Sequence, residues 1–199
     1  KKFYINRSVL IPRPETELLV DQTLKISNKY SEKTILDIGT GSGCLIISVL
    51  LERKKWKGVA IDISKHALKI AKTNAKMQHI KNRIRFINSD IDKFYSNKYD
   101  FIISNPPYVK SSSLLSLDED IKRFEPLLAL NGGSDGCKIL RMVIKKSSEL
   151  LKRNGGFILE IDDKQTEVIK DMLKKYDFHN IKVIKDLSGK NRCLSSTKK

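Results

Sequence analysis

The tetrapeptide Asn105-Pro106-Pro107-Tyr108 brings together groups that can hold an amide or amino nitrogen. Consecutive prolines fix φ and lack backbone donors, so the turn is stiff and nearby carbonyl oxygens can accept hydrogen bonds from a ligand. The Asn105 side-chain oxygen and the Pro106 carbonyl could accept both hydrogens of one NH2 group, with Tyr108 as a flat wall beside it. This grip would aim a delocalised, weakly nucleophilic nitrogen at a methyl group, and the proton could leave after attack. The same residues also suit an ordinary loop.

The glycine-rich segment 39–43, Gly-Thr-Gly-Ser-Gly, follows a short apolar stretch and precedes a helical pattern. Glycines at such a turn let the backbone approach a ligand closely, and the amides at the helix start are free to bind it. This arrangement predicts a cofactor that contains adenosine. The dinucleotide pattern Gly-x-Gly-x-x-Gly is not met, because Cys44 stands where the third glycine belongs. The phosphate-binding loop also fails, since Cys137 replaces its second glycine.

Three aspartates stand at or just beyond the ends of expected strands. Asp62 could accept hydrogen bonds from both ribose hydroxyls of a nucleoside. Asp37 could meet an amino group or hold the glycine turn, and Asp90 could accept from an adenine amino group. Together they would attract a nucleoside that carries ammonium and sulfonium groups but would repel a pyrophosphate. S-Adenosylmethionine is therefore the expected cofactor, although each aspartate taken singly could be an ordinary polar strand end.

Alternating strand and helix patterns must position these groups. Strands are expected at residues 33–37, 59–62, 84–87, 99–104, 157–161 and 181–184 and near Cys193. Helices are expected at 44–51, from Ser64 as the cap to about 75, at 138–151 and in a segment ending near Tyr176. The alternation predicts an α/β fold with a doubly wound, mostly parallel seven-stranded sheet, helices on both faces and a crevice at the carboxyl ends of the strands. Residues 110–120 are predicted to form a mobile loop over that crevice, and residues 195–199 a frayed tail.

Composition limits the class of protein. A chain of 199 residues that is 40% hydrophobic can build a core, and it contains no run near the roughly 20 apolar residues of a membrane helix. The net charge of +16 suits nucleic acid or another acidic partner, although genome composition could also produce it. Three cysteines without a Cys-x-x-Cys pair favour a reducing compartment, so a cytoplasmic location is expected. Because the chain does not begin with Met, we expect it to be a fragment that lacks upstream sequence.

The sequence resembles a known family of enzymes in several of its motifs. Asp37 to Gly43, Asp62 and Ser104 to Tyr108 are similar to class I methyltransferases that act on planar nitrogens of DNA, RNA or protein glutamine. Further stretches narrow the resemblance to the release factor glutamine methyltransferases, and they lie at residues 9–17, 123–130 and 132–136. The resemblance covers essentially the whole chain. It implies residues 1–32 as a substrate-side segment and linker remnant, and residues 33–199 as the S-adenosylmethionine-dependent catalytic domain.

The resemblance implies methyl transfer from S-adenosylmethionine to the side-chain N5 of the glutamine in the Gly-Gly-Gln motif of peptide chain release factors, with S-adenosylhomocysteine as product. The implied catalytic residues are Asn105, Pro106, Pro107 and Tyr108. The implied cofactor site consists of Asp37, Gly39, Thr40, Gly41, Ser42, Gly43, Asp62, Asp90, Ile91 and Asn105. The implied substrate site adds Arg13, Pro14, Glu15 and Glu17 to the four catalytic residues. Pro14 followed by two glutamates is equally a good helix start, and Ile91 replaces an aromatic residue of some relatives.

Two rival functions stay open. A DNA or RNA adenine N6-methyltransferase would use the same tetrapeptide to hold the exocyclic amine of a flipped base. Against it stand segment 10–17 and the lack of a clustered basic arm. A cofactor-binding module without catalysis is disfavoured by the intact tetrapeptide. No metal site is expected, because His66, His79 and His179 lie far apart in sequence. The chain is taken as a monomer.

Overall fold

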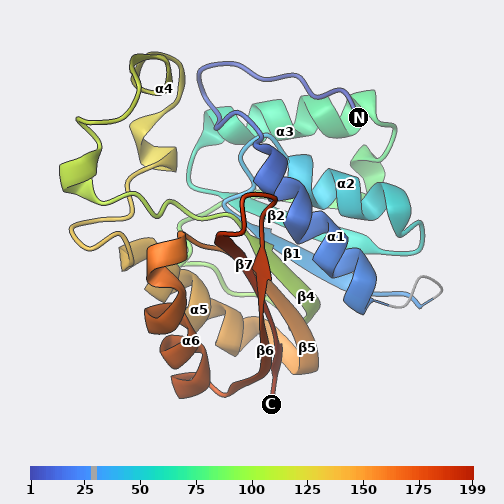
Figure 1. The fold of residues 1–199 in the computed structure, drawn as a ribbon. Helices are drawn as coiled ribbons and strands as arrows, with labels where there is room; N and C mark the ends of the chain where they lie inside the picture. The colour runs from blue at the N-terminus through green and yellow to red at the C-terminus, as the bar shows by residue number, and fades with distance from the viewer. Residues whose placement is uncertain (28–30) are drawn as a thin grey trace.

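A mixed sheet organises the computed structural model, which describes residues 1–27 and 31–199 (Figure 1). Its strands are β1 (Thr34–Ile38), β2 (Lys57–Asp62), β3 (Ile84–Asn88), β4 (Tyr99–Ser104), β5 (Leu151–Glu160), β6 (Phe178–Lys185) and β7 (Asn191–Lys198). They form a seven-stranded sheet in the order β3-β2-β1-β4-β5-β7-β6, in which β7 runs antiparallel to both neighbours and the other pairings are parallel. The predicted doubly wound, mostly parallel sheet is confirmed.

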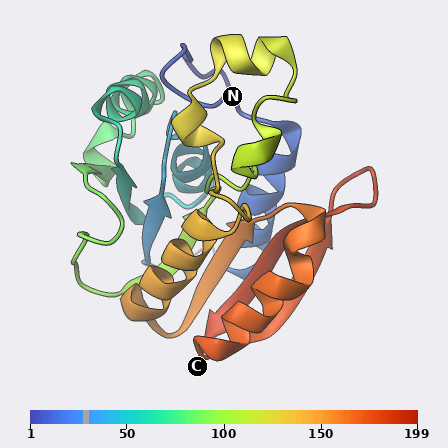
Figure 2. The same ribbon diagram turned by 90° about the vertical axis from the view of Figure 1, so that its left-hand side faces the viewer.

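Helices cover both faces of this sheet (Figures 1 and 2). They are α1 (Glu17–Ile26), α2 (Cys44–Glu52), α3 (Lys65–Met77), α5 (Lys138–Leu150) and α6 (Thr166–Lys175), whereas the short helix α4 (Glu119–Phe124) lies away from both faces. Successive strand residues point to opposite faces, so in β1 Ile35 packs in the core layer with α1 and α2, whereas Leu36 packs with α5 and α6. In the described part of the chain, no helix is long and apolar enough to cross a membrane.

Local signals set where the helices begin. Ser64 caps α3, because its side chain accepts a hydrogen bond from the Ala67 amide at 3.2 Å, as predicted. Helix α2 begins after Gly43, whose φ of +80° turns the chain out of the glycine segment. The predicted helices at 44–51, 64–75 and 138–151 are confirmed to within a few residues as α2, α3 and α5.

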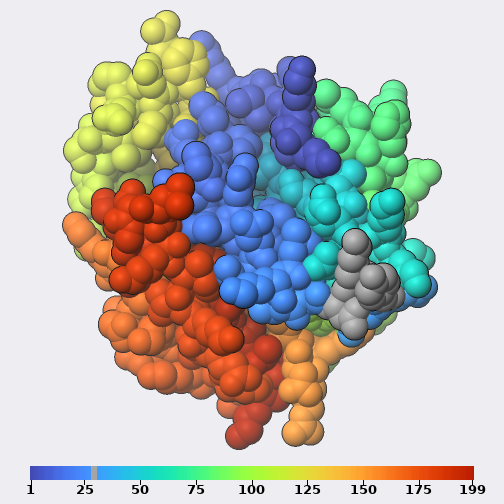
Figure 3. Space-filling model, turned by 45° about the vertical axis from the view of Figure 1, so that its right-hand side comes forward, coloured from blue at the N-terminus to red at the C-terminus, as the bar shows by residue number. Residues whose placement is uncertain are grey.

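The N-terminal segment lies across this assembly (Figure 3, dark blue). Two hydrogen bonds join it to Asn74 of α3. The Tyr4 amide donates to Asn74 Oδ1 at 2.7 Å, and Asn74 Nδ2 donates to the Tyr4 carbonyl at 2.9 Å. Val9 is 1% exposed and packs with Ala67 and Ile70 of the same helix. These contacts carry the segment toward the carboxyl ends of the parallel strands.

Two expectations about the C-terminal part of the sheet were wrong. Strand β5 begins at Leu151, directly after α5, and includes Gly155 and Gly156 rather than starting at residue 157. Gly156 fits there because a Cβ would lie 2.5 Å from the Phe101 ring. The expected frayed tail at 195–199 is mostly strand, since β7 extends to Lys198 between β5 and β6. Ser195 and Ser196 are buried in it; Ser195 is paired with both β5 and β6, and Ser196 is paired with β5.

Gly43→Ala tests how closely α2 and α3 approach. A Cβ at Gly43 would lie 3.0 Å from Ile47 Cδ1 and 3.1 Å from Ala71 Cβ, and the positive φ adds backbone strain. We expect a loss of about 2–5 kcal/mol in the free energy of unfolding, measured by urea denaturation. Gly189→Ala is the matched control, because Gly189 has φ +79° and no atom within 4 Å of a Cβ, so only the strain of about 1–2 kcal/mol applies. Equal losses in the two variants would show that the packing term is absent.

Candidate active site

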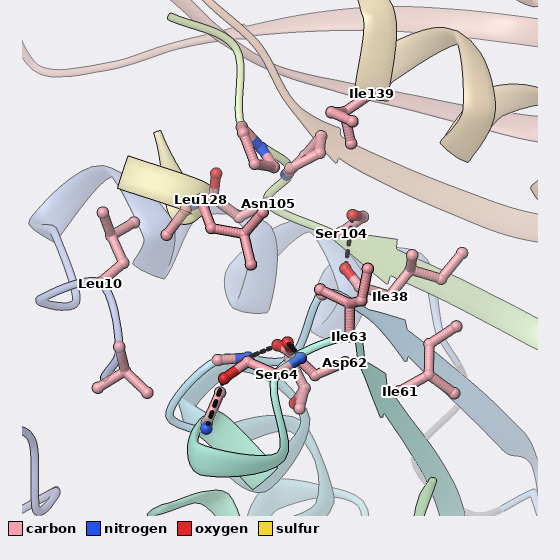
Figure 4. Close-up of a pocket in the computed structure, with 18 of the residues that line it drawn as sticks. Leu10, Ile38, Ile61, Asp62, Ile63, Ser64, Ser104, Asn105, Leu128 and Ile139 are labelled. Atoms are coloured by element: carbon pink, nitrogen blue, oxygen red, sulfur yellow. Dashed lines mark hydrogen bonds between the residues drawn. The ribbon is translucent and has the colours of Figure 1, made fainter. Parts of the chain in front are cut away.

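A cavity of about 390 Å³ lies at the carboxyl ends of β1, β2 and β4. Figure 4 shows Asp62 and Ser64 on one side of it, Asn105 and Leu128 on the other, and Leu10 at one end. The predicted site residues that line it are Gly39, Thr40, Gly41, Ser42, Asp62, Asp90, Ile91, Asn105, Pro106 and Pro107. Residues 126, 128 and 129 also line it, whereas none of residues 110–120, which hold a 3-10 turn and the start of α4, does so.

The glycine turn is bonded to the end of β2. The amides of Gly39 and Thr40 both donate to the Ile61 carbonyl, at 2.9 and 3.0 Å. Gly39 and Gly41 have positive φ, and a Cβ on either would meet no atom within 4 Å. The turn therefore presents bare backbone to open space, as a site for a large ligand requires.

Asp62 is oriented by two backbone amides. Its Oδ2 accepts from Gly41 at 2.9 Å and its Oδ1 accepts from Ser64 at 2.8 Å (Figure 4). The pKa of the Asp62 carboxyl is raised, because the effect of burial exceeds the opposing effect of these two hydrogen bonds. Each carboxylate oxygen keeps a further lone pair, so both can accept from hydroxyl groups of a ligand.

Asp37 does not line the cavity and is fully buried beneath the glycine turn. Thr40 Oγ1 donates to Asp37 Oδ2 at 2.7 Å, while Oδ1 has no hydrogen-bond partner among the described residues. Burial, and to a smaller extent the negative Asp62, raises the pKa of Asp37 to about 7. Of the two roles considered for Asp37, the geometry favours holding the loop.

Asn105 lies directly after β4, whose last residue is tied to β1 because Ser104 Oγ donates to the Ile38 carbonyl at 2.7 Å. Asn105 Nδ2 donates to Thr16 Oγ1 at 3.4 Å. Tyr108 does not line the cavity; its hydroxyl donates to Glu160 Oε1 at 3.1 Å. Burial and the negative charge of Glu160 raise the pKa of Tyr108.

The sequence did not predict Thr16, which lines the cavity, or Glu160, which lies behind it. Thr16 lines the cavity, and its Oγ1 donates to Glu160 Oε2 at 3.3 Å. Glu160 ends β5, is 2% exposed, and has a pKa that burial raises to about 7. Their pairing joins positions 144 apart in the chain, so no local spacing could reveal it.

The residues expected along a substrate channel are divided. Arg13, Pro14 and Glu17 line a second cavity of about 280 Å³, and Glu15 lines neither. The two cavities share the wall residues Pro12, Thr16, Cys44 and Leu45. Pro14 also opens a 3-10 turn that leads into α1, so the helix-start interpretation holds as well. The Arg13 guanidinium is paired with the buried Glu125 carboxylate, which joins the N-terminal segment to the segment 126–129. Over the residues the structure describes, no cluster of His, Cys, Asp or Glu could hold a metal ion.

The pKa of Asp37 gives the stability a defined pH dependence. The folded state holds this proton more tightly than the unfolded state, so the contribution is fully present below pH 4 and is lost as the pH rises through 7. Asp37→Asn keeps an acceptor for Thr40 and does not ionise. We expect equal unfolding free energies at pH 4 and a variant that is more stable at pH 8, at about 1.4 kcal/mol per pKa unit. Urea denaturation at a series of pH values checks this, with Asp171→Asn at an exposed position as the control. If the unfolding free energies of Asp37→Asn and wild type changed equally with pH, the expectation would be contradicted.

Comparison with known proteins places this site in a family. Residues 14–121 match the methyltransferase small domain family. The chain is 36% identical over 195 residues to the release factor glutamine methyltransferase of Thermodesulfovibrio yellowstonii, covering 97% of this chain and 70% of that protein. It is 37% identical over 192 residues to the enzyme of that name from Enterococcus faecalis, covering 96% and 68%.

Solved structures agree on the fold. A methyltransferase from Pyrococcus furiosus matches with a TM-score of 0.72 at 19% identity, over 98% of this chain and 88% of that one. The human Mettl16 catalytic domain, solved with an RNA hairpin, matches with a TM-score of 0.75 at 16% identity, over 98% and 74%. These likenesses confirm the class I methyltransferase fold. The identity over nearly the whole length, together with a glycine turn and a diproline corner facing one cavity, shows that the chain belongs to the release factor glutamine methyltransferase family.

Proposed function

We propose that this protein transfers the methyl group of S-adenosylmethionine to the side-chain amide nitrogen of the Gly-Gly-Gln glutamine in peptide chain release factors. The observation that carries the proposal is that the glycine turn, Asp62 and the Asn105 to Pro107 corner all line one cavity. Family membership supports the choice of substrate. The three cysteines are unpaired, which supports a cytoplasmic site of action.

The cofactor side of the cavity suits S-adenosylmethionine. The open backbone at Gly39 and Gly41 can lie against the ligand, and the two amide-oriented oxygens of Asp62 can accept from its ribose hydroxyls. Asp90 and Ile91 line the same cavity, and they are the residues proposed to border the adenine. When bound, the cofactor supplies a methyl group activated by a positively charged sulfur. The ionised carboxylate of Asp62 at the cavity wall favours that cation over a neutral ligand.

The substrate side is formed by the diproline corner. The Asn105 Oδ1 and the Pro106 carbonyl would accept the two hydrogens of the glutamine NH2, which orients the nitrogen lone pair toward the methyl carbon. Apolar side chains of Leu10, Ile139 and Met142 line the same cavity and reduce the water around the attacking nitrogen. After transfer the nitrogen carries the positive charge, and its proton can leave to solvent. The hydrogen bond from the Tyr108 hydroxyl to Glu160 holds Tyr108 in place next to the two prolines. We propose that its ring forms a wall beside the glutamine side chain.

A methyl-transfer assay with labelled S-adenosylmethionine tests the proposal. We expect label in a release factor and none in its Gly-Gly-Gln variant with Gln changed to Ala. RNA and DNA are assayed in parallel, because the charge of +16 also suits a nucleic-acid substrate. Label in RNA or DNA but not in the release factor would overturn the proposed substrate.

Asn105→Ala separates catalysis from cofactor binding. Loss of the amide grip should abolish transfer, while the Kd for S-adenosylhomocysteine, measured by calorimetry, changes by less than about tenfold, or 1.4 kcal/mol. Asn82→Ala, at an exposed position in the turn before β3, is the control and should keep full activity. Wild-type rates in Asn105→Ala would remove this residue from the mechanism.

A further inference from the structure

Two linked hydrogen bonds, one part-buried and one buried, lead from the cavity to the end of β5. Asn105 Nδ2 is 3.4 Å from Thr16 Oγ1, and Thr16 Oγ1 is 3.3 Å from Glu160 Oε2. Thr16 is 5% exposed and Glu160 is 2% exposed, so water does not compete strongly for these groups. Glu160 does not line the cavity, and it therefore acts on a ligand only through its neighbours.

The carboxylate of Glu160 determines which atom donates in each hydrogen bond of this series. An ionised Glu160 can only accept, so the hydroxyl protons of Tyr108 and Thr16 both point to it. With its only proton committed to Glu160, Thr16 Oγ1 can only accept from Asn105, and the Asn105 atom that faces it must be the NH2 group. The Oδ1 oxygen is then the amide atom left for a ligand.

We propose that Glu160, acting through Thr16, is a positioning residue that fixes the Asn105 amide with its oxygen available to the substrate, and so selects substrates that present an NH2 group. The proposal rests on the proposed function for the identity of that NH2 group. Without these hydrogen bonds the Asn105 side-chain amide could rotate by half a turn and present its own NH2 group to the substrate. Two NH2 groups would then face each other, and neither could accept a hydrogen bond.

The surroundings of Glu160 explain why a carboxylate here is a functional feature. The titratable or charged groups that act on it are Glu15, Cys44, Tyr108, Arg192 and Cys193. Arg192 is the only cation among them and is itself paired with Asp186 at 3.2 Å. Glu160 therefore forms no ion pair within the described residues, and a buried carboxylate without one destabilises the fold. A glutamine would be less costly, but it carries a donor and would no longer dictate the direction of the chain.

Thr16→Val tests the proposal, because it removes the hydroxyl and keeps the shape. At pH 8, where Glu160 is ionised, we expect kcat/KM for methyl transfer to a release factor to fall at least tenfold, while the Kd for S-adenosylhomocysteine changes less than threefold. Thr16→Ser keeps the hydroxyl and should stay within threefold of wild type. Thr23→Val is the matched control, because it makes the same exchange at a buried position of α1 that takes no part in the Asn105–Thr16–Glu160 hydrogen bonds. It should leave the rate unchanged.

Two further results separate positioning from general damage. Glu160→Gln and Thr16→Val together should lose less activity than the product of their separate losses, because they interrupt one chain. The rate ratio of wild type to Thr16→Val should also shrink as the pH falls below 7, where the pKa of Glu160 of about 7 leaves it neutral. Multiplicative losses, a pH-independent ratio, or Thr16→Val activity within threefold of Thr23→Val would each overturn the proposal.

A readout that needs no substrate distinguishes this inference from the proposed function. The side-chain amide resonances of Asn105, identified by their loss in Asn105→Ala, should shift in ¹⁵N spectra of Thr16→Val but not of Thr23→Val. Unchanged Asn105 resonances in Thr16→Val would refute the hydrogen-bond chain. Absence of methyl transfer by the wild type, with the expected Asn105 shift present, would refute only the release factor as substrate.

Discussion

The parallel pairing of β1 with β2 and β4 is the constraint on which the site depends. Ile38 at the end of β1 lies opposite Ile61 and Ser104, so three chain segments leave the sheet at the same edge. Side-chain and turn hydrogen bonds reinforce this edge, from Ser104 Oγ to the Ile38 carbonyl and from the glycine turn to the Ile61 carbonyl. A slip of one residue in β2 would turn Asp62 to the other face and remove it from the cavity.

Burial of carboxylates is the second feature that the site shares. Desolvation raises the pKa of Asp37, Asp62 and Glu160, and none of them forms an ion pair in the described chain. Several carboxylates elsewhere pair with lysine or arginine, as Asp100 does with Lys33 and Lys152. Burial destabilises the ionised form of a carboxylate, so three carboxylates desolvated by burial near one cavity are typical of a functional site. On the cofactor side they suit a cationic ligand, and on the substrate side Glu160 directs hydrogen bonds.

The sequence was informative where spacing along the chain reflects local structure. The glycine turn, the Ser64 cap and the alternation of strands and helices are all short-range patterns, and they predicted the fold and the polar and glycine-turn part of the cavity lining, but not its apolar part. The sequence was less informative where burial comes from distant neighbours. The polar run ending β7 gives no strand signal of its own, since its pairing with β5 and β6 is made by backbone groups. Thr16 and Glu160 meet only because α1 packs beside β5.

The diproline corner explains why such a distant contact is needed. The Pro106 carbonyl has little freedom, because its own ring fixes φ and the following Pro107 restricts ψ. The Asn105 amide is nearly symmetric in shape, and rotation by half a turn exchanges an acceptor for a donor without changing its packing. Only hydrogen bonds can decide between the two orientations, and only an acceptor-only group at the end of the chain gives those bonds one direction. A buried carboxylate at the end of β5 therefore complements a proline-stiffened turn at the end of β4.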